Sequence, residues 1–230
     1  MLRCDNILVR QDGFELQADL VLEAGRKAAV IGPSGAGKST LLLAIAGYIP
    51  LARGRIIWRG QDITLSAPGN RPIAMLFQDN NLFPHLSVEQ NVGLGLRPDM
   101  RLTADDRKRV TSALERVGLA GQSQKRPGGL SGGQQSRAAL ARVLLQDRPL
   151  LLLDEPFSAL GPALRADMLD LVSDLVAETG ASLMMVTHAP EDARRIADDL
   201  IFVADGKAHP TVPAAEALKT PSPALQEYLG

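Results

Sequence analysis

The sequence predicts an α/β fold with a mainly parallel sheet, a smaller antiparallel β part and a helical region inserted in the middle. In the second half of the chain, short apolar strands alternate with helical segments, which is the order of βα units. Near the start, apolar and polar residues alternate instead, as in an antiparallel sheet with one face in water. Between these parts, residues 87–146 show helical patterns.

The first half of the chain is expected to be strand-rich. From Phe14 to Leu22 apolar side chains recur at every second position, which indicates a half-buried strand. The run Ala28–Ile31 is apolar on both faces and ends at a glycine-rich turn, after which Leu41–Ala46 continues as a buried helix. Ile56–Trp58 and Ile73–Phe77 also have the composition of strands.

The second half returns to alternating strands and helices after the helical region. Within that region, the spacing of Val110, Leu114 and Val117 places three apolar side chains on one helix face. Asp205–Gly206 is a hairpin signal, and the proline-rich tail is expected to form short helices at most. The alternating segments are Leu150–Leu153, Ala163–Val176, Leu183–Val186, Glu191–Ala197 and Leu200–Val203.

Composition excludes several classes of protein. Apolar residues make up 45% of the 230 residues, enough for a core, and 25 basic against 26 acidic residues argue against a nucleic-acid partner. The single cysteine, Cys4, rules out an internal disulfide and is expected to act as a small hydrophobe. Met1–Asp5 lacks the apolar core of a signal peptide, and no apolar run approaches the ~20 residues of a membrane helix. Any membrane role would therefore depend on another polypeptide.

A phosphate-binding loop lies between the strand Ala28–Ile31 and the helix that follows it. The pattern G-x-x-x-x-G-K-[ST] is matched in full, and its glycines allow successive backbone N–H groups to wrap a phosphate. Lys38 would face the β- and γ-phosphates, and the Ser39 hydroxyl would bind Mg²⁺. The alternative, a glycine-rich turn without a ligand, is disfavoured by this strand–loop–helix context. The nucleotide-binding residues are Gly32, Pro33, Ser34, Gly35, Ala36, Gly37, Lys38, Ser39 and Thr40.

A second acidic site follows the buried strand Leu150–Leu153. Asp154 is placed to reach the Mg²⁺ shell, while Glu155 can face a water in line with the γ-phosphate and act as a general base. The alternative is that the two acids only cap the strand before Pro156. Together with the phosphate loop, the pair predicts a nucleoside triphosphatase.

The motif Leu130–Gln134, Leu-Ser-Gly-Gly-Gln, precedes a helix over about 134–146 and offers a second helix N-terminus for an anion. With this signature and the two phosphate motifs, the chain resembles the nucleotide-binding subunits of ABC transporters over essentially its full length. In that family two subunits enclose two ATP molecules, each between the phosphate loop of one chain and the signature of the other. The resemblance implies that Ser131, Gly132, Gly133 and Gln134 act on the ATP of a second copy.

The resemblance assigns further residues. Gln78 matches the glutamine that touches Mg²⁺ and links the core to the helical region, and His188 matches the histidine that contacts the γ-phosphate. Catalysis would thus involve Lys38, Gln78, Glu155 and His188, with Ser39, Gln78 and Asp154 around the metal. Leu82, Phe83 and His85 would face a membrane subunit, unless Phe83 belongs to the core.

Two positions depart from the family pattern. The stretch Ser158-Ala159-Leu160-Gly161 carries glycine where the family has aspartate, which predicts weaker coupling between the two nucleotide sites. Gln11 stands where the family has an aromatic ring that stacks on adenine. Phe14 is nearby but also fits the buried face of its strand, so GTP is expected to compete with ATP.

A finer resemblance, to the ATPases of bacterial thiamine importers, is carried by the stretches 75–83 and 91–96. The resemblance implies one ABC ATPase domain over residues 1–230, with a nucleotide-binding core of 1–86 and 147–230 and a helical signature subdomain of 87–146. It also implies an ATP-sandwich homodimer, permease subunits, a periplasmic solute-binding protein, and a peripheral place on the cytoplasmic face of the inner membrane.

Four alternatives remain open at this stage. The chain would serve another small-solute importer, or act as a soluble ABC ATPase on DNA or ribosomes, although residues 41–149 lack coiled-coil heptads. A non-enzymatic ATP-binding regulator is suggested by Gly161 and Gln11, but Glu155 and His188 are present. A small-molecule kinase would leave the signature without a purpose.

Overall fold

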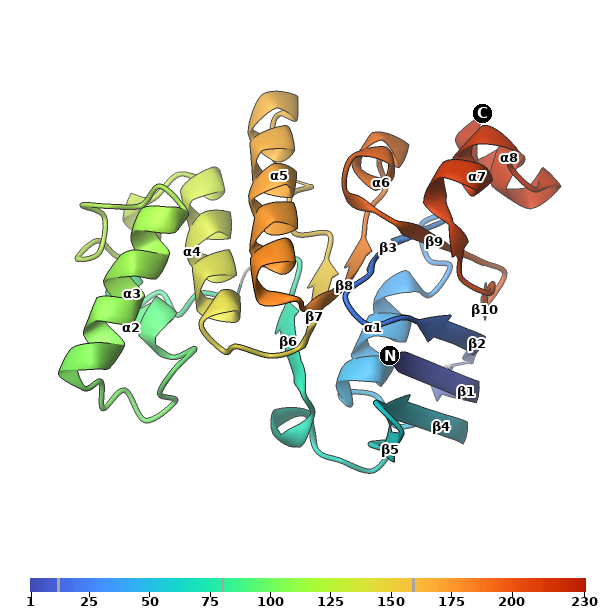
Figure 1. The fold of residues 1–230 in the computed structure, drawn as a ribbon, viewed down its shortest axis with the longest axis horizontal. Coiled ribbons are helices and arrows are strands. Elements are labelled where there is room, and N and C mark those ends of the chain that lie inside the picture. The colour runs from blue at the N-terminus through green and yellow to red at the C-terminus, as the bar shows by residue number, and fades with distance from the viewer. Residues whose placement is uncertain (12, 80, 159) are drawn as a thin grey trace.

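A computed structural model describes residues 1–11, 13–79, 81–158 and 160–230. The described residues form a mixed sheet in which parallel strands occupy one part and antiparallel strands the other (Figure 1). The strand order is β5-β4-β1-β2-β10-β9-β3-β8-β7-β6, with β11 paired to β9. This confirms the predicted α/β class with a mainly parallel part and an antiparallel part.

The parallel part places three strand ends at one edge. Its strands run in the order β9-β3-β8-β7-β6, and nearly all their residues are buried, as expected for strands covered on both faces. Because these strands are parallel, the residues that follow β3, β7 and β8 lie side by side. The strands are β3 (Lys27–Ile31), β6 (Ile73–Leu76), β7 (Leu150–Asp154), β8 (Ser182–Val186) and β9 (Asp199–Ala204).

The antiparallel part contains a strand that the apolar pattern did not reveal. Alternate burial along β2 (Phe14–Leu22) confirms the prediction there, but β1 (Leu2–Gln11) has a bulge between Cys4 and Ile7, where Asn6 adopts a φ of 47°. The bulge breaks the alternation that sequence reasoning depends on. Cys4 is fully buried, and burial raises its pKa to about 12, so it behaves as a small hydrophobe.

One short strand, which follows a hairpin turn, joins the two parts. The prediction of a turn at Asp205–Gly206 is confirmed, with positive φ at both residues. After it, β10 (Lys207–Ala208) pairs antiparallel with β9 and parallel with β2, and so links the two strand groups. The remaining strands are β4 (Arg53–Trp58), β5 (Gln61–Asp62) and β11 (Val212–Pro213).

The helices divide into those on the sheet and those of the inserted region. Three helices of that region gather at the end of the molecule farthest from β1, β2 and β4 (Figure 1). They share a core that contains the predicted stripe Val110, Leu114 and Val117. The inserted helices are α2 (Val88–Gly93), α3 (Ala104–Arg116) and α4 (Gly132–Leu144); the others are α1 (Lys38–Ala46), α5 (Pro162–Thr179), α6 (Pro190–Ile196), α7 (Ala214–Lys219) and α8 (Pro223–Leu229).

The described helices have no candidate for a bilayer span, since none combines sufficient length with sufficient apolar character. The division into a core of 1–86 and 147–230 and a helical subdomain of 87–146 stays a prediction.

Candidate functional site

The phosphate loop lies between β3 and α1, and its backbone needs glycine. Gly32, Gly35 and Gly37 have φ values of 148°, 77° and 104°. A Cβ at Gly32 would lie 1.9 Å from the carbonyl oxygen of Val203, which is a backbone atom and cannot give way. Gly32 is therefore required both by its φ and by the close approach of β9.

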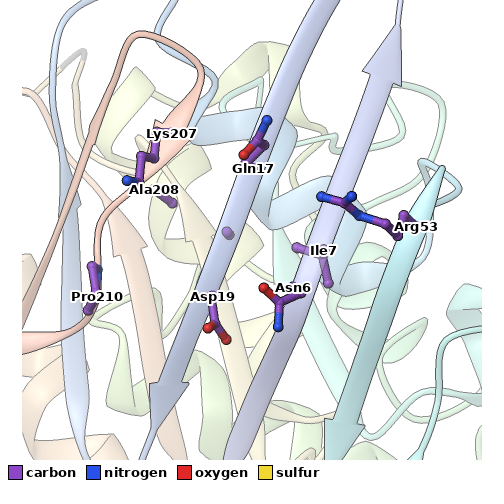
Figure 2. Close-up of a pocket in the computed structure, with 9 residues that line it drawn as sticks. Asn6, Ile7, Gln17, Asp19, Arg53, Lys207, Ala208 and Pro210 are labelled. Atoms are coloured by element: carbon purple, nitrogen blue, oxygen red, sulfur yellow. The ribbon is translucent and has the colours of Figure 1, made fainter.

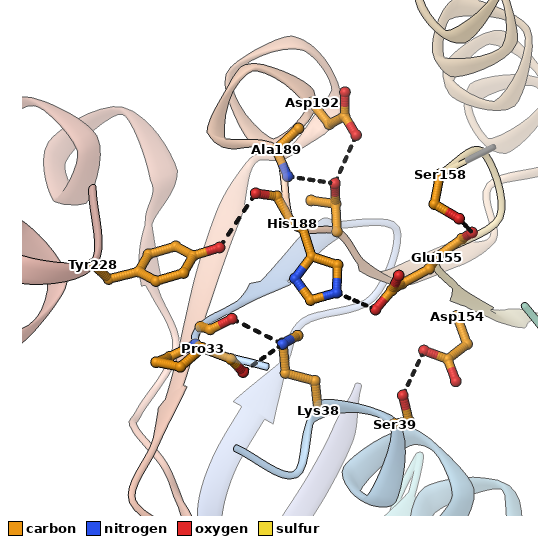
Figure 3. A network of polar contacts seen from close by, with 12 residues as sticks. Pro33, Lys38, Ser39, Asp154, Glu155, Ser158, His188, Ala189, Asp192 and Tyr228 are labelled. Atoms are coloured by element: carbon orange, nitrogen blue, oxygen red, sulfur yellow. Dashed lines mark hydrogen bonds and ion pairs between the residues drawn. The ribbon is translucent and has the colours of Figure 1, made fainter. Parts of the chain in front are cut away.

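Lys38 opens α1 and closes the loop. Its Nζ donates to the carbonyl oxygens of Gly32 and Pro33, each at 2.8 Å (Figure 3). The residue is only 5% exposed, and burial lowers the pKa of its ammonium group, while the carboxylates of Glu155 and Asp154 act in the opposite direction. The loop thus holds one positive charge at its centre.

Ser39 and Asp154 meet across the sheet edge, 115 residues apart in sequence. The Ser39 hydroxyl donates to Oδ1 of Asp154 at 2.9 Å. Asp154 is the last residue of β7 and is buried, so desolvation raises the pKa of its carboxyl group, an effect that the hydrogen bond from Ser39 opposes. A hydroxyl and a carboxylate therefore present oxygen atoms to the same point.

Glu155 and His188 form the third pair. Glu155 follows β7 with a left-handed φ of 46°, which turns it away from the strand, and its backbone N–H donates to the carbonyl of Val186 at 3.2 Å. Nε2 of His188 contacts Oε1 of Glu155 (Figure 3). The His188 side chain is 44% exposed and that of Glu155 is 14% exposed. The pair thus brings a carboxylate and an imidazole together beside the phosphate loop.

A hydrogen-bond network around His188 was not anticipated from the sequence. The Thr187 hydroxyl donates to Oδ2 of Asp192 at 2.6 Å and accepts from the backbone N–H of Ala189 at 3.1 Å. Arg165 lies 4.0 Å from the same carboxylate. The residues on both sides of His188 are therefore fixed, and the pairing of Thr187 with an acid five residues on was the signal available in the sequence.

One cleft collects the phosphate loop and the catalytic candidates. Its volume is about 580 Å³, within the range of small-molecule sites. Ala36 does not line it, because that side chain packs into the core beneath the loop. The cleft is lined by Gln11, Phe14, Ser34, Gly35, Gly37, Lys38, Ser39, Thr40, Gln78, Glu155 and His188.

The signature segment lies outside this cleft. Ser131 is the N-cap of α4: its hydroxyl accepts from the Gln134 N–H, and the Gln134 side chain accepts from the Ser131 N–H. Ser131 and Gly132 are exposed. Gly133 is buried, and a Cβ there would lie 2.5 Å from a methyl group of Leu164 on α5, so this glycine also permits helix packing. Within one chain the structure does not bring the signature to the phosphate loop.

The segment after Gln78 is exposed and firmly anchored. Phe83 is 47% exposed and meets His85 edge-on at 6.0 Å, so the alternative that Phe83 belongs to the core is wrong. Buried Asn91 accepts from the Phe83 N–H at 2.7 Å and donates to its carbonyl at 3.0 Å. Sequence reasoning gave Asn91 no role. Leu82 is partly buried between two core clusters, and Asn80 lies outside the described residues.

A hollow of about 320 Å³ adjoins Phe83. It runs between the end of α1, β6 and α4, and its lining includes Tyr48, Phe77, Phe83 and Arg148. Tyr48 is 53% exposed, and its ring meets Phe77 edge-on at 5.4 Å. Aromatic side chains in contact with water around a hollow are typical of a protein-binding surface.

Gly161, which stands where the family has aspartate, fits its local structure. Gly161 is the N-cap of α5 with a φ of −63°, has no side-chain cap and precedes Pro162 at the first helical position. A Cβ at Gly161 would meet nothing within 4 Å. Neither backbone geometry nor packing therefore demands glycine here. Ala159, in the same stretch, lies outside the described residues.

A further hollow, of about 350 Å³, lies on the outer face of the antiparallel strands (Figure 2). Arg53 and Lys207 stand at its two sides, with Asn6, Gln17 and Asp19 between them. None of the predicted site residues lines it. This hollow therefore takes no part in the chemistry expected from the motifs.

Comparison with known proteins agrees with this geometry. A family model described as ABC transporter matches residues 16–158. The chain is 60% identical to the thiamine import ATP-binding protein ThiQ of Cereibacter sphaeroides and 56% identical to the protein of the same name of Ruegeria sp. strain TM1040, in both cases over 100% of each chain. It also superposes on the dimeric structure of the ATP-binding cassette MJ0796 in a post-hydrolysis state bound to ADP and Pi.

That superposition has a TM-score of 0.82 at 27% identity and covers 93% of this chain and 99% of the other. The fold is therefore that of an ABC ATPase cassette, a P-loop NTPase. The phosphate loop and the catalytic candidates lie in one cleft, and the matched segment is more than half of the sequence, so the chain belongs to the ABC transporter family.

Proposed function

We propose that this chain is the ATP-hydrolysing subunit of a bacterial thiamine importer. The observation that carries the proposal is full-length identity of 60% to a thiamine import ATP-binding protein. It is joined by a cleft lined by Lys38 and the Glu155–His188 pair, with Asp154 bonded to Ser39 of its lining. The cargo is inferred from the relatives, because a transported solute is recognised by other subunits.

ATP would bind with its triphosphate in the loop of residues 32–40. The backbone N–H groups of the loop and of the start of α1 would face the phosphates, because the positive end of the helix dipole favours negative charge there. Lys38 adds a full positive charge from within the loop. These groups bind and orient the triphosphate before any reaction.

Mg²⁺ suits the oxygen donors beside the loop. Ser39 and Asp154 already meet at 2.9 Å, and Gln78 lines the same cleft, so the donors are a hydroxyl, a carboxylate and an amide, all of which offer oxygen. These three residues would hold the ion, with the phosphates as further ligands. When bound, it neutralises charge on the β- and γ-phosphates.

Glu155 and His188 would act on the attacking water. Glu155 lies at the cleft edge with its carboxylate in contact with the imidazole, so it can orient a water and accept its proton. His188, which lines the same cleft, would contact the γ-phosphate. Little covalent help is needed for phosphoryl transfer, so positioning and charge neutralisation provide most of the catalysis.

A second copy of the chain would complete each site. Ser131 and Gly132 are exposed and lie away from their own cleft, which is the placement needed to meet the nucleotide of another molecule. The structural relative bound to ADP and Pi is dimeric, which supports the same arrangement here. ATP binding would close the pair, and hydrolysis would reopen it.

The hollow beside Phe83 is where a permease would dock. Exposed Phe83 and Tyr48 offer an apolar surface, and Asn91 holds the Phe83 backbone in place. The chain would then act as a peripheral protein at the cytoplasmic face of the inner membrane, with a periplasmic solute-binding protein on the other side.

The nucleobase preference stays a prediction. Gln11 and Phe14 both line the cleft, but the Phe14 ring lies against Gly37, where an added Cβ would be 2.9 Å from it. Gln11 has no ring, and the ring of Phe14 is half-buried, so neither offers an exposed ring on which adenine would stack. GTP is therefore expected to compete with ATP. Hydrolysis rates at matched ATP and GTP concentrations check this.

Reconstituted transport tests the function. The chain, the permease and the binding protein are assembled in proteoliposomes, and uptake of labelled thiamine and ATP hydrolysis are measured together. We expect thiamine to stimulate hydrolysis, and Glu155→Gln to abolish turnover while an ATP-bound dimer accumulates. The matched control is Glu115→Gln, an exposed glutamate on α3.

Three results would count against the proposal. If hydrolysis survives Glu155→Gln, Glu155 has no catalytic role. If Glu155→Gln changes neither turnover nor the amount of ATP-bound dimer, the chain is a pure binding module. Stimulation by another solute in place of thiamine would keep the ATPase and change the cargo.

A further inference from the structure

The C-terminal helix α8 reaches the catalytic cleft through one residue. Leu225 of α8 is 3% exposed and anchors the helix in the core cluster of β3 and β9. The Tyr228 ring packs near Phe202, with centroids 5.9 Å apart, and Phe202 stacks on His209. The helix is therefore attached by apolar contacts, independently of the polar end of Tyr228.

The polar end of Tyr228 touches the main chain of the candidate site. Its hydroxyl donates to the carbonyl oxygen of His188 at 3.3 Å (Figure 3). Burial raises the pKa of Tyr228, a backbone hydrogen bond from Gly32 lowers it, and the charge of Glu155 raises it. The phenol thus lies beside the first glycine of the phosphate loop as well as the carbonyl of His188.

His188 depends on such anchors because its side chain is not enclosed by packing. The imidazole is 44% exposed and contacts Glu155. On one side, the Thr187 hydroxyl holds the Ala189 N–H and is itself held by Asp192. Tyr228 holds the carbonyl of His188 itself, from the other side (Figure 3).

We propose that Tyr228 is a positioning residue for hydrolysis: its hydroxyl fixes the backbone of His188 and thereby aims the imidazole at Glu155 and the γ-phosphate. Tyr228 is absent from the lining of the cleft, so it acts through His188 and not on the nucleotide. The inference rests on the proposed function, since it concerns the hydrolytic step of that site. It assigns the last helix of the chain a part in turnover.

The conservative variant Tyr228→Phe separates this role from a structural one. It removes the hydroxyl and keeps the ring that packs on Phe202, so α8 stays attached. Leu225→Ala is the comparison variant, because it weakens the apolar anchor of α8 and leaves the hydroxyl in place. A role in mere attachment predicts a large effect of Leu225→Ala and none of Tyr228→Phe.

The test uses the reconstituted transporter. Tyr228→Phe is expected to lower kcat roughly twofold to tenfold, the range for one hydrogen bond, with the KM for ATP changed less than about twofold. The melting temperature should stay within about 2 °C of the parent protein. A rise in KM equal to the fall in kcat, or an unchanged kcat, would overturn the inference.

A double-mutant cycle tests whether the effect passes through His188. In a His188→Ala background the imidazole is gone, so Tyr228→Phe should change the residual rate by less than about 1.5-fold. If Tyr228→Phe and His188→Ala lower the rate independently, so that their effects multiply in the double variant, the inference is overturned. Glu155→Gln is measured alongside: if it leaves the rate intact, the proposed function fails, whereas its loss with normal Tyr228→Phe turnover refutes only the role of Tyr228.

Discussion

The phosphate-loop cleft and the signature segment use opposite strategies for holding polar groups. Beside the phosphate loop, each ionisable side chain is held by a polar partner: Lys38 by loop carbonyls, Asp154 by Ser39, and Glu155 by His188. At the signature, Ser131 and Gln134 only cap their own helix, and no charged side chain takes part. The cleft can therefore bind a charged ligand alone, while the signature can only add neutral donors to a ligand brought to it.

The difference is also one of energetic cost. Desolvation lowers the pKa of Lys38 and raises the pKa of Asp154, which favours the neutral form of each side chain. Keeping both groups charged therefore costs free energy of folding. The signature holds exposed backbone at a helix N-terminus, which water satisfies at little cost. Substitutions in the two regions should accordingly differ in what they change.

The largest effect is expected from Lys38→Ala. Loss of the buried charge that we propose to bind phosphate should lower ATP affinity roughly 10- to 100-fold in the isolated chain. Isothermal titration calorimetry of the isolated chain with ATP and Mg²⁺ measures this. Lys108→Ala, an exposed lysine on α3, serves as the control and should bind ATP normally. If Lys38→Ala and the parent bind ATP with equal affinity, the cleft does not bind the charged ligand in the way that distinguishes it from the signature segment.

The next effect is expected from Gly132→Asp at the signature. A Cβ there meets nothing within 4 Å, so the chain should fold normally, and an aspartate in the first turn favours the helix. Facing the ATP of a second copy, the same carboxylate should weaken ATP-dependent dimerisation by at least roughly tenfold. Sedimentation with ATP measures the dimer, in the Glu155→Gln protein with and without Gly132→Asp.

Its neutral counterpart, Gly132→Ser, separates charge from size and should dimerise nearly as the parent does. ATP affinity of the isolated Gly132→Asp chain should be unchanged. A loss of that affinity would mean that the signature serves its own cleft.

A smaller effect, on stability, is expected from Asp154→Asn. Because the pKa of Asp154 is raised in the folded state, the native protein binds this proton more tightly than the unfolded chain, and ionisation costs stability as pH rises through the folded pKa. Removing the charge should raise the melting temperature of the nucleotide-free protein at pH 7.5. About 1 kcal/mol corresponds to roughly 2–4 °C for a chain of this size.

The gain should shrink as the pH is lowered, since the parent carboxyl group then takes up its proton. Asp174→Asn, an exposed position on α5, should show no such pH-dependent gain. An Asp154→Asn protein that melts below the parent at pH 7.5 would show that Asp154 is stabilising in the folded state.

The smallest effect on stability is expected from Gly161→Asp, which restores the carboxylate of the family pattern. The side chain has room and a compatible backbone, so it should cap α5 and add a few tenths of a kcal/mol. In the assembled transporter it should also raise the ATPase rate by strengthening the coupling between sites. An unchanged rate would refute the hypothesis that Gly161 weakens this coupling.

Local motifs in the sequence were sufficient to predict most of the cleft. Lys38 and Ser39 belong to one continuous motif, and Asp154 ends a clearly apolar strand that Glu155 follows, so their meeting follows from parallel topology. Asn91 and Tyr228 were missed because their roles depend on backbone partners far along the chain or around a turn. Asparagine and tyrosine are common in loops and terminal segments, where most of them have no functional role.

Asn91 also has a mechanical consequence. By holding both backbone polar groups of Phe83 from a position on α2, it ties the exposed aromatic ring to the helical region. A rotation of those helices would carry Phe83 through the same angle. A permease docked on that ring would then follow the tilt of the helices while the sheet stays still.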